Sequence, residues 1–348
     1  MPSELDVLEQ RLASSQGAHS RFAALLELST LINETDARRA IDMANEALGI
    51  ATSIGDQGLI AEASCTLGHA LQHSGDYPNA VTHYETAVQL FATHGPSERY
   101  AFALYYLGGC HSLLYRPDEA MHYIDMAHDI FQSIDHRYGI AKSMQGKSLT
   151  LRVTGKLEGA IRLSEAAADI LRTLPAGRQA LGYVLLNTAS MYEDLDVPLD
   201  GLAHVEEALG IADQIHSDRL RGYLIGQLGW IRAVQGNWSE AKQLFEECLS
   251  IAKRVDDRAL VAWGNYYHAR MFDLQGNVET AVRLYALSAD LCQELDIPEC
   301  GVRCHEKLAM IFEDRGDTSR AWVHYRRFND LKGHLLSRGS QGKRKHAS

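Results

Sequence analysis

Three residues near the carboxyl end have types and spacing that suit metal binding. Cys300 and Cys304 are four residues apart, which places both thiols on one face of a helix, and His305 follows directly. A structural zinc site takes four ligands, commonly from two close pairs, and the sequence offers no second pair. We therefore expect no metal. Cys248 and Cys292 lie in apolar helical patterns and are expected to pack as small apolar residues.

Two histidines form the other candidate cluster. His69 and His73 are one helical turn apart, so they either face an inner surface together or form a solvated pair on a helix face. The solvated pair is the favoured interpretation. No Ser/His/Asp set, His-Glu-x-x-His motif, phosphate-binding glycine loop or paired-carboxylate site is apparent. The sequence therefore predicts no catalytic residues and no cofactor, and a chain that is not an enzyme.

Small residues recur at a fixed interval and indicate the elements that carry these side chains. The interval is 40 residues, with one slip of a single residue, and the series is Ala40, Ala80, Ala120, Ala160, Gly201, Ala241, Ala281 and Ala321. A small side chain is needed where two helices cross closely, because a larger one pushes their axes apart. A period of this length predicts an array of about eight stacked repeats.

A second series supplies a turn within each repeat. Glycine stands five residues before the small residue at Gly75, Gly155, Gly236, Gly276 and Gly316, and two other repeats have Arg116-Pro117 or Val197-Pro198. Glycine ends helices in the left-handed conformation, and proline suits the first turn of the next helix. Apolar residues keep helical spacing on both sides of these turns. Each repeat is thus predicted to be an antiparallel pair of helices of about 16 residues, and no segment has the pattern of a strand.

The repeats resemble tetratricopeptide repeats over residues 18–336. The matching positions are the Leu-Gly pairs Leu67-Gly68, Leu107-Gly108 and Leu228-Gly229, and the small and aromatic positions Ala80, Tyr84, Ala87, Ala241 and Phe245. The family's usual unit is shorter, and long-helix versions are familiar in bacterial signalling proteins that sense a peptide or protein. The segment Ala321–Lys332 is similar to the last helix of arrays that precede cyclase or kinase modules. The resemblance implies an all-α fold, a right-handed α-solenoid of about eight antiparallel helix pairs.

In this family the first helix of each repeat lines a concave groove that binds a partner. Counting along these helices, the resemblance assigns a partner-binding groove to Tyr105, Lys142, Gln145, Arg152, Tyr183, Asn187, Tyr223, Gln227, Trp230, Trp263, Tyr266 and Arg270. Lys142 and Arg152 would hold a carboxylate, and Asn187 and Gln227 would bind peptide backbone. Two alternatives stay open: the aromatic residues pack between neighbouring first helices, and Arg270 forms a salt bridge with a neighbouring helix.

These observations favour a non-enzymatic scaffold that binds a protein or peptide in its groove. The alternative is a sensor subunit of a bacterial signalling system whose output module is on another chain, and an enzyme with an unrecognised site is the least favoured. The net charge of −11 argues against nucleic-acid binding, and no apolar run is long enough to span a membrane. We expect a cytoplasmic protein with a capping helix at 1–17, the repeats at 18–336 and a disordered basic tail at 337–348.

Overall fold

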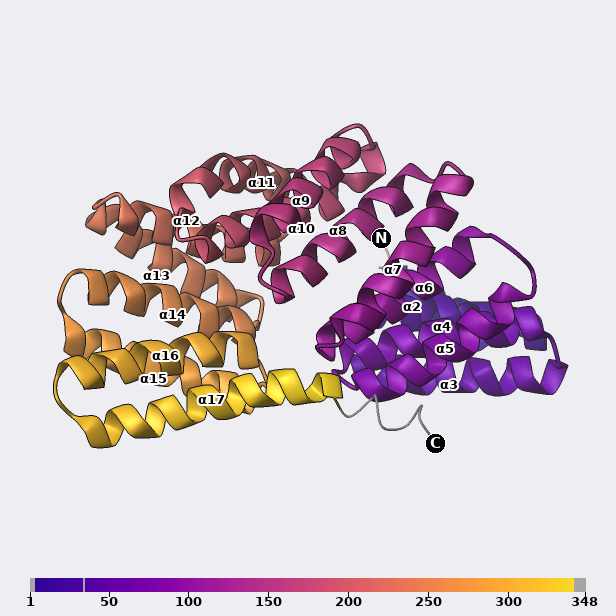
Figure 1. Ribbon diagram of the computed structural model, residues 1–348. Helices are drawn as coiled ribbons and strands as arrows, with labels where there is room; N and C mark the ends of the chain where they lie inside the picture. Colours follow the sequence, from indigo (N-terminus) through magenta and orange to yellow (C-terminus); the bar gives the residue numbers. More distant parts are fainter. Residues whose placement is uncertain (1–3, 34, 341–348) are drawn as a thin grey trace. The chain divides into compact units, whose positions relative to one another are not determined.

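The computed structural model describes residues 4–33 and 35–340 and is built from α-helices, with no strand in these ranges. A short helix precedes eight pairs, and two 3₁₀ turns occur in the middle of the chain (Figure 1). The helices are α1 (Glu4–Ser14), α2 (Ala18–Ile32), α3 (Ala37–Ile54), α4 (Gln57–His73), α5 (Tyr77–Ala92), α6 (Glu98–Leu113), α7 (Pro117–Ser133), α8 (Arg137–Val153), α9 (Leu157–Arg172), η1 (Pro175–Gly177), α10 (Arg178–Asp194), η2 (Pro198–Gly201), α11 (Leu202–Gln214), α12 (Asp218–Val234), α13 (Trp238–Arg254), α14 (Arg258–Leu274), α15 (Val278–Glu294), α16 (Pro298–Asp314) and α17 (Thr318–Ser340).

The chain forms two compact units, Met1–Thr154 and Gly155–Ser348. Unit 1 contains α1 to α8 and unit 2 contains α9 to α17, so the boundary falls inside the fourth predicted repeat. In each of the other seven repeats the two helices pack on each other. The predicted all-α repeat solenoid is confirmed. Of the predicted basic tail, residues 337–340 continue α17, and residues 341–348 lie outside the described residues.

The predicted turns have the expected backbone geometry. Gly75 has a φ of 83° and Gly276 a φ of 75°, which glycine adopts without steric cost. In the two repeats that have proline at this turn, Tyr115 and Asp196 take the left-handed conformation instead, with φ of 55° and 63°. The repeat geometry therefore requires the left-handed conformation at this turn, and glycine adopts it with the lowest steric energy.

The small residues lie where helices cross closely. Ala40, Ala80, Ala241 and Ala281 are all fully buried. At Gly201, an added Cβ would be 3.1 Å from the Ala189 backbone, which is closer than an ordinary van der Waals contact. The Leu-Gly pairs serve the same purpose, because an added Cβ at Gly108 would be only 2.6 Å from Ile124 of the paired helix.

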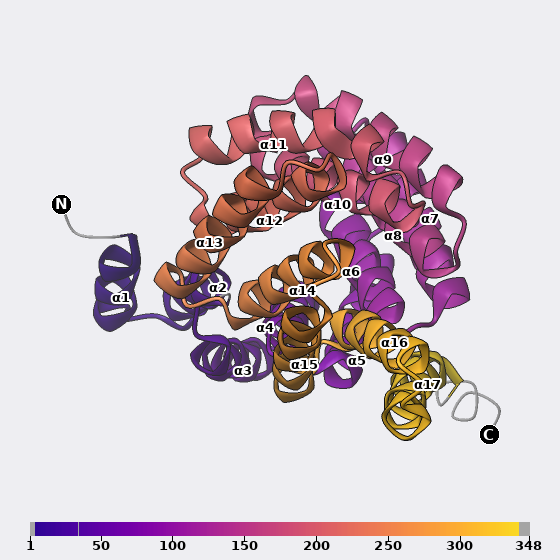
Figure 2. The same cartoon turned by 90° about the vertical axis from the view of Figure 1, so that its left-hand side faces the viewer.

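Within each unit, the first helices of successive repeats contact one another directly. In unit 1 the row is α2, α4, α6 and α8, and in unit 2 it is α10, α12, α14 and α16. The second helices pack mainly on first helices, and each unit curves with its first helices on the inner side (Figure 2). We call the side chains that these helices carry on that side the inner face of the unit.

Helix α8 has an unusual buried side. Its buried residues are Gly139, Ala141, Ser143, Gln145, Gly146, Ser148 and Thr150, and none of them is a large apolar residue. Burial of large apolar side chains provides most of the stabilisation between repeats. At α8, which ends unit 1, the large apolar side chains come from α7 instead: Gly139 lies against the Phe131 ring and Gly146 against Ile124.

Candidate functional site

The inner face of unit 2 carries eight of the predicted groove residues. Gln227, Trp230 and Tyr266 are buried, whereas Tyr183, Asn187, Tyr223, Trp263 and Arg270 are half-buried. They come from α10, α12 and α14, which the repeat stacking brings side by side. The predicted residues of this unit therefore lie on neighbouring helices, but several are covered by their neighbours.

A buried charge network joins the helices of this face. Arg270 of α14 forms an ion pair with Glu193 of α10, and only 14% of the Arg270 side chain and 6% of the Glu193 side chain are exposed. Tyr267 donates a hydrogen bond of 2.9 Å to the other oxygen of Glu193. Arg303 of α16 pairs with Asp194 and lies 3.7 Å from Glu193. Arg270 thus forms a salt bridge with a neighbouring helix, which was one of the two alternatives that the sequence left open.

Aromatic rings enclose the two arginines. The Arg270 guanidinium carbon lies 3.5 Å from the centre of the Trp230 ring, and that of Arg303 lies 5.8 Å from the Trp263 ring. Burial disfavours the charged form of both arginines, but nearby Tyr266 and Glu193 outweigh it and raise the pKa of each. Both side chains therefore remain cationic on a largely dehydrated surface.

Three polar groups on α10 and α12 have no hydrogen-bond partner among the described residues. Gln227 donates through its Nε2 to Ser190 and to the Leu186 carbonyl, but its Oε1 is buried without a donor. The Trp230 Nε1 is a buried donor without an acceptor. The half-buried amide of Asn187 has no polar contact. Buried polar groups are nearly always paired in proteins, so this cluster indicates a place where a ligand or water completes the bonding.

Tyr183 and Tyr223 lie near the beginning of their helices. The Tyr223 hydroxyl donates to Asp257 at 3.4 Å, and Asp257 also pairs with Arg219 at 2.8 Å. Burial, followed by the charge of Asp257, raises the pKa of Tyr223. Tyr183 is half-buried on α10. These two tyrosines form an edge of the inner face, apart from the charge network.

The inner face of unit 1 carries the other four predicted residues, and Lys142 is its most informative member. Its ammonium lies 5.4 Å from the centre of the Tyr105 ring and 3.4 Å from the Gln145 Oε1. It makes no ion pair with a carboxylate anywhere in the described ranges. Burial lowers the pKa of Lys142, but Tyr105 and Tyr138 outweigh it and raise it, so the side chain stays charged. Gln145 is buried and Arg152 half-buried.

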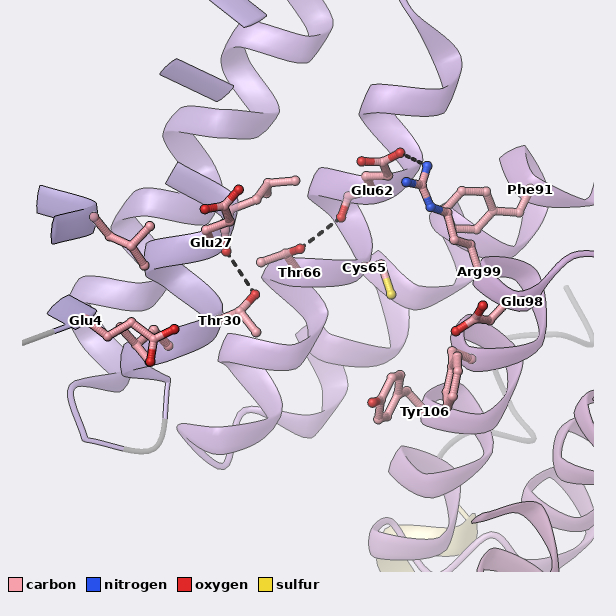
Figure 3. Close-up of a pocket in the computed structure, with 14 residues that line it drawn as sticks. Glu4, Glu27, Thr30, Glu62, Cys65, Thr66, Phe91, Glu98, Arg99 and Tyr106 are labelled. Atoms are coloured by element: carbon pink, nitrogen blue, oxygen red, sulfur yellow. Dashed lines mark hydrogen bonds and ion pairs between the residues drawn. The ribbon is translucent and has the colours of Figure 1, made fainter. Parts of the chain in front are cut away.

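Unit 1 also contains an open pocket that the predicted residue set does not include (Figure 3). Its volume is about 650 Å³, and its walls come from α1, α2, α4, the end of α5 and α6. Apolar walls are provided by Leu8, Leu26, Leu31, Cys65, Phe91, Phe102 and Tyr106. Four carboxylates and one guanidinium lie among them: Glu4, Glu27, Glu62, Glu98 and Arg99. Arg99 pairs with Glu62, and Glu27 pairs with Arg11 at 2.6 Å.

The positional rule that selected the groove residues could have found part of this pocket. The rule assigned Tyr105 of the third repeat to the groove. The equivalent position 40 residues earlier is Cys65, which lines the pocket. The contribution of α1 had no sequence signal, because that helix lies outside the repeat period.

The prediction of a solvated histidine pair is wrong for His69. The His69 ring packs against Tyr106 with ring centres 5.0 Å apart, and its Nδ1 lies 3.0 Å from the Asn33 amide nitrogen. Burial, together with His73 and Lys142, lowers the pKa of His69 to about 4. His73 is exposed and touches His69 edge-on.

The cysteines near the carboxyl end are buried, and Cys292 of α15 joins Cys300 and Cys304 of α16. From the sequence, Cys292 was not grouped with Cys300 and Cys304, because a sequence does not show which residues of adjacent helices are in contact. Across the part of the chain that the structure describes, no group of three or more His, Cys, Asp and Glu side chains is arranged to hold a metal ion. No helix in that part is long and apolar enough to cross a membrane.

Comparison with known proteins supports the repeat assignment. Two models described as tetratricopeptide repeat match residues 59–133 and 225–255. A search of curated protein sequences found no match. A Rap protein complexed with competence and sporulation factor has a TM-score of 0.75 and 14% identity, over 95% of this chain and 91% of that one.

Two further structures are similar. Aspartyl phosphate phosphatase F from Bacillus subtilis has a TM-score of 0.69 and 12% identity, over 95% of this chain and 88% of that one. A Rap conjugation gene regulator of plasmid pLS20, in complex with the Phr* peptide, has a TM-score of 0.66 and 15% identity, over 95% and 93% of the two chains. At these identities the likeness shows a shared fold. With the 40-residue period, the two matches show that the chain contains tetratricopeptide repeats at residues 59–133 and 225–255.

Proposed function

We propose that this protein is a non-enzymatic scaffold whose first helices bind a peptide segment of a partner. The observation that carries the proposal is the set of unpartnered polar groups on α10 and α12: the Asn187 amide, the Gln227 Oε1 and the Trp230 Nε1. A peptide backbone offers alternating N–H donors and C=O acceptors, and this set offers one acceptor, one donor and one amide that is both.

Binding would complete these bonds. The Gln227 Oε1 would accept from a backbone N–H, the Trp230 Nε1 would donate to a backbone carbonyl, and Asn187 would hold the next peptide group. An unpaired buried polar group costs about 1–3 kcal/mol, so pairing two of them makes a substantial contribution to affinity. Both atoms are covered in this structure, and a bound peptide requires small side-chain movements around them.

Unit 1 has candidate binding groups of its own. The Lys142 ammonium, half-buried and without a carboxylate, suits an acidic side chain or a terminal carboxylate. We keep Arg152, which lies ten residues further along the same helix, as a second cation for such a group. The pocket of unit 1 has room and apolar walls for one or two large side chains of the partner.

A random peptide display library provides a probe that does not require the natural partner. Peptides selected on the purified protein are measured by calorimetric titration against wild type, Asn187→Ala, Gln227→Leu and Gln243→Leu. Gln243 is the matched control, because it is an exposed glutamine on α13, a second helix. We expect Asn187→Ala and Gln227→Leu each to weaken binding about 5- to 30-fold, which corresponds to about 1–2 kcal/mol. The control should bind as wild type does.

The proposal fails if both inner-face variants bind the selected peptides with unchanged affinity while keeping native helicity. The partner would then use another surface, and the aromatic residues of the inner face would be packing residues only. If Gln227→Leu loses helicity, Asn187→Ala still tests the proposal, because Asn187 makes no polar contact that its removal would break.

A second form of the proposal is a peptide sensor whose output module is on another chain. It is favoured by the shared fold of a Rap protein bound to competence and sporulation factor and of a regulator bound to the Phr* peptide. A sensor should bind its output protein differently with and without peptide, which a pull-down in the presence of a selected peptide measures. Equal recovery in both conditions excludes this form and leaves the scaffold.

The absence of catalysis is also part of the proposal and needs its own test. One structural relative is named an aspartyl phosphate phosphatase. Release of phosphate from acetyl phosphate, a small acyl phosphate, is the direct measurement, and we expect the rate without protein. We also expect a cytoplasmic location, since the described cysteines are all free thiols.

A further inference from the structure

Three of the six cysteines meet between α15 and α16 of unit 2. Cys292 of α15 lies against α16 at Gly301, which stands between Cys300 and Cys304 in the sequence. Ser288 lies one turn before Cys292 and joins the cluster: the Cys304 Sγ donates to its Oγ at 3.2 Å, and the Cys300 Sγ lies 3.5 Å from the same Oγ. We call Cys292, Cys300 and Cys304 the thiol cluster. The other three cysteines lie on separate helices, α4, α6 and α13.

The backbones of the two helices approach closely at the thiol cluster. Gly301 of α16 faces Cys292, and an added Cβ at Gly301 would lie 3.5 Å from the Cys292 Cβ. A disulfide needs two Cβ atoms about 3.5–4.5 Å apart. At this level the two helices therefore approach as closely as a disulfide between them requires.

A cavity gives small molecules access to one member of the cluster. It has a volume of about 260 Å³ and is lined by Cys292, Gly301, His305, Arg327 and residues near them, but not by Cys300 or Cys304. A water molecule occupies about 30 Å³, so the cavity has room for a hydroperoxide beside the Cys292 sulfur. One member of the thiol cluster thus lines the cavity, and the other two do not.

We propose that the thiol cluster is an oxidation site for hydrogen peroxide, in which Cys292 is oxidised first and a thiol of α16 then forms a disulfide with it. The Cys292 thiolate attacks one peroxide oxygen, the O–O bond breaks and hydroxide leaves, so that Cys292 becomes a sulfenic acid. The thiol of Cys300 or Cys304 attacks that sulfur, the S–O bond breaks and water leaves. The protein loses two hydrogens, and the peroxide is reduced to two molecules of water.

The chemistry of the cluster favours Cys292 as the first residue to react. Hydrogen bonds from the thiols of Cys300 and Cys304 lower the pKa of Cys292, since they stabilise its thiolate. The same bond raises the pKa of Cys300. The thiolate is the nucleophile toward peroxides, and the access through the cavity points to the same residue.

The disulfide would tie the last repeat to the one before it. Repeat arrays touch only their neighbours, and in the described residues the pair α16–α17 packs on unit 2 through α14 and α15. A covalent bond between α15 and α16 restricts the opening of that pair. Oxidation would therefore slow proteolysis of the carboxyl-terminal repeat.

The test is intact-protein mass spectrometry and peptide mapping of the reduced full chain after treatment with hydrogen peroxide. We expect a mass lower by two hydrogens, a fall in titratable thiols from six to four, and a peptide that links Cys292 to Cys300 or Cys304. The variants Cys300→Ser and Cys304→Ser show which thiol forms the bond. Limited proteolysis of the same samples should show α16–α17 cleaved more slowly after oxidation and returned to its original rate by a reductant.

Cys292→Ser should abolish the disulfide, whereas Cys248→Ser should leave it unchanged, because Cys248 is a buried thiol of α13 outside the cluster. The proposal is overturned if peptide mapping of the wild type shows no bond within the cluster at peroxide concentrations that oxidise free cysteine. It is also overturned if Cys65, the half-buried thiol, reacts before Cys292. Mapping of the wild type decides the question even where a variant folds poorly.

Discussion

Removal of Glu193 should destabilise unit 2 more than any loss of a surface ion pair. Glu193 is the only carboxylate paired with Arg270 in the described ranges, and it also accepts from Tyr267. Breaking a buried pair by deleting one partner costs about 3–5 kcal/mol. Arg270 keeps its contact with Trp230, and Arg303 keeps Asp194, so we place Glu193→Ala near the lower end, at about 3 kcal/mol.

The assay must measure local stability, because repeat arrays do not unfold as a single cooperative unit. Native-state hydrogen exchange gives the opening free energy of α10, α12 and α14 separately, and urea unfolding followed by circular dichroism gives the total. The control is Glu294→Ala, which removes the exposed pair with Arg258 and should cost about 0–1 kcal/mol. Adding Arg270→Met to Glu193→Ala should recover part of the loss, since the orphaned charge is then gone.

Equal effects of Glu193→Ala and Glu294→Ala would refute this reasoning. The ion pair across α10 and α14 would then be no stronger than a solvated one. Failure of Arg270→Met to recover stability would have a narrower meaning: the loss would come from the Tyr267 hydroxyl, which also bonds to Glu193.

Three further predictions concern other parts of the chain. Ala281→Trp should lower stability by about 1–3 kcal/mol or more, because it overpacks a fully buried helix crossing, and an unchanged urea midpoint would contradict the assigned register. The pKa of His69 is lowered from 6.5 to about 4, so the unfolded chain binds the proton more tightly and unit 1 should lose stability as the pH falls from 6.5 toward 4. His69→Gln should flatten that dependence in urea titrations, and a parallel pH profile for the two proteins would speak against it. Purified protein should contain no stoichiometric zinc by elemental analysis, and one zinc per chain, lost in Cys304→Ser, would be the contrary result.

The repeat fold was readable from the sequence because its constraints are steric and local. A close crossing admits only Ala or Gly, and a tight turn favours glycine, so the two series mark every helix pair before any contact is known. Even the exceptions follow the geometry, since Tyr115 and Asp196 take the left-handed conformation where glycine is missing.

The site could be predicted only in part, because its bonds join distant residues. The rule for inner-facing positions places Trp230, Tyr266 and Arg270 on neighbouring helices, but Glu193 lies 77 residues before Arg270, and no local pattern shows that they pair. The meeting of Cys292 with Cys304 is the same kind of contact. The division of the chain at α8 was not anticipated either, because the small and polar residues of that helix keep a normal helical period.

The single-residue slip in the 40-residue period has a structural consequence of its own. The second helices α3, α5, α7 and α9 begin 40 residues apart, and so do the first helices α12, α14 and α16. The extra residue falls between these two sets, in the link from α9 to α10 that contains the 3₁₀ turn η1. One residue inserted inside a helix would rotate everything after it by about 100° and turn the inner face away. Placed in a link, it leaves the phase of every later helix intact. The link at η1 is therefore a junction at which the chain can be lengthened, and repeats from other arrays exchanged, without losing the alignment of the side chains downstream.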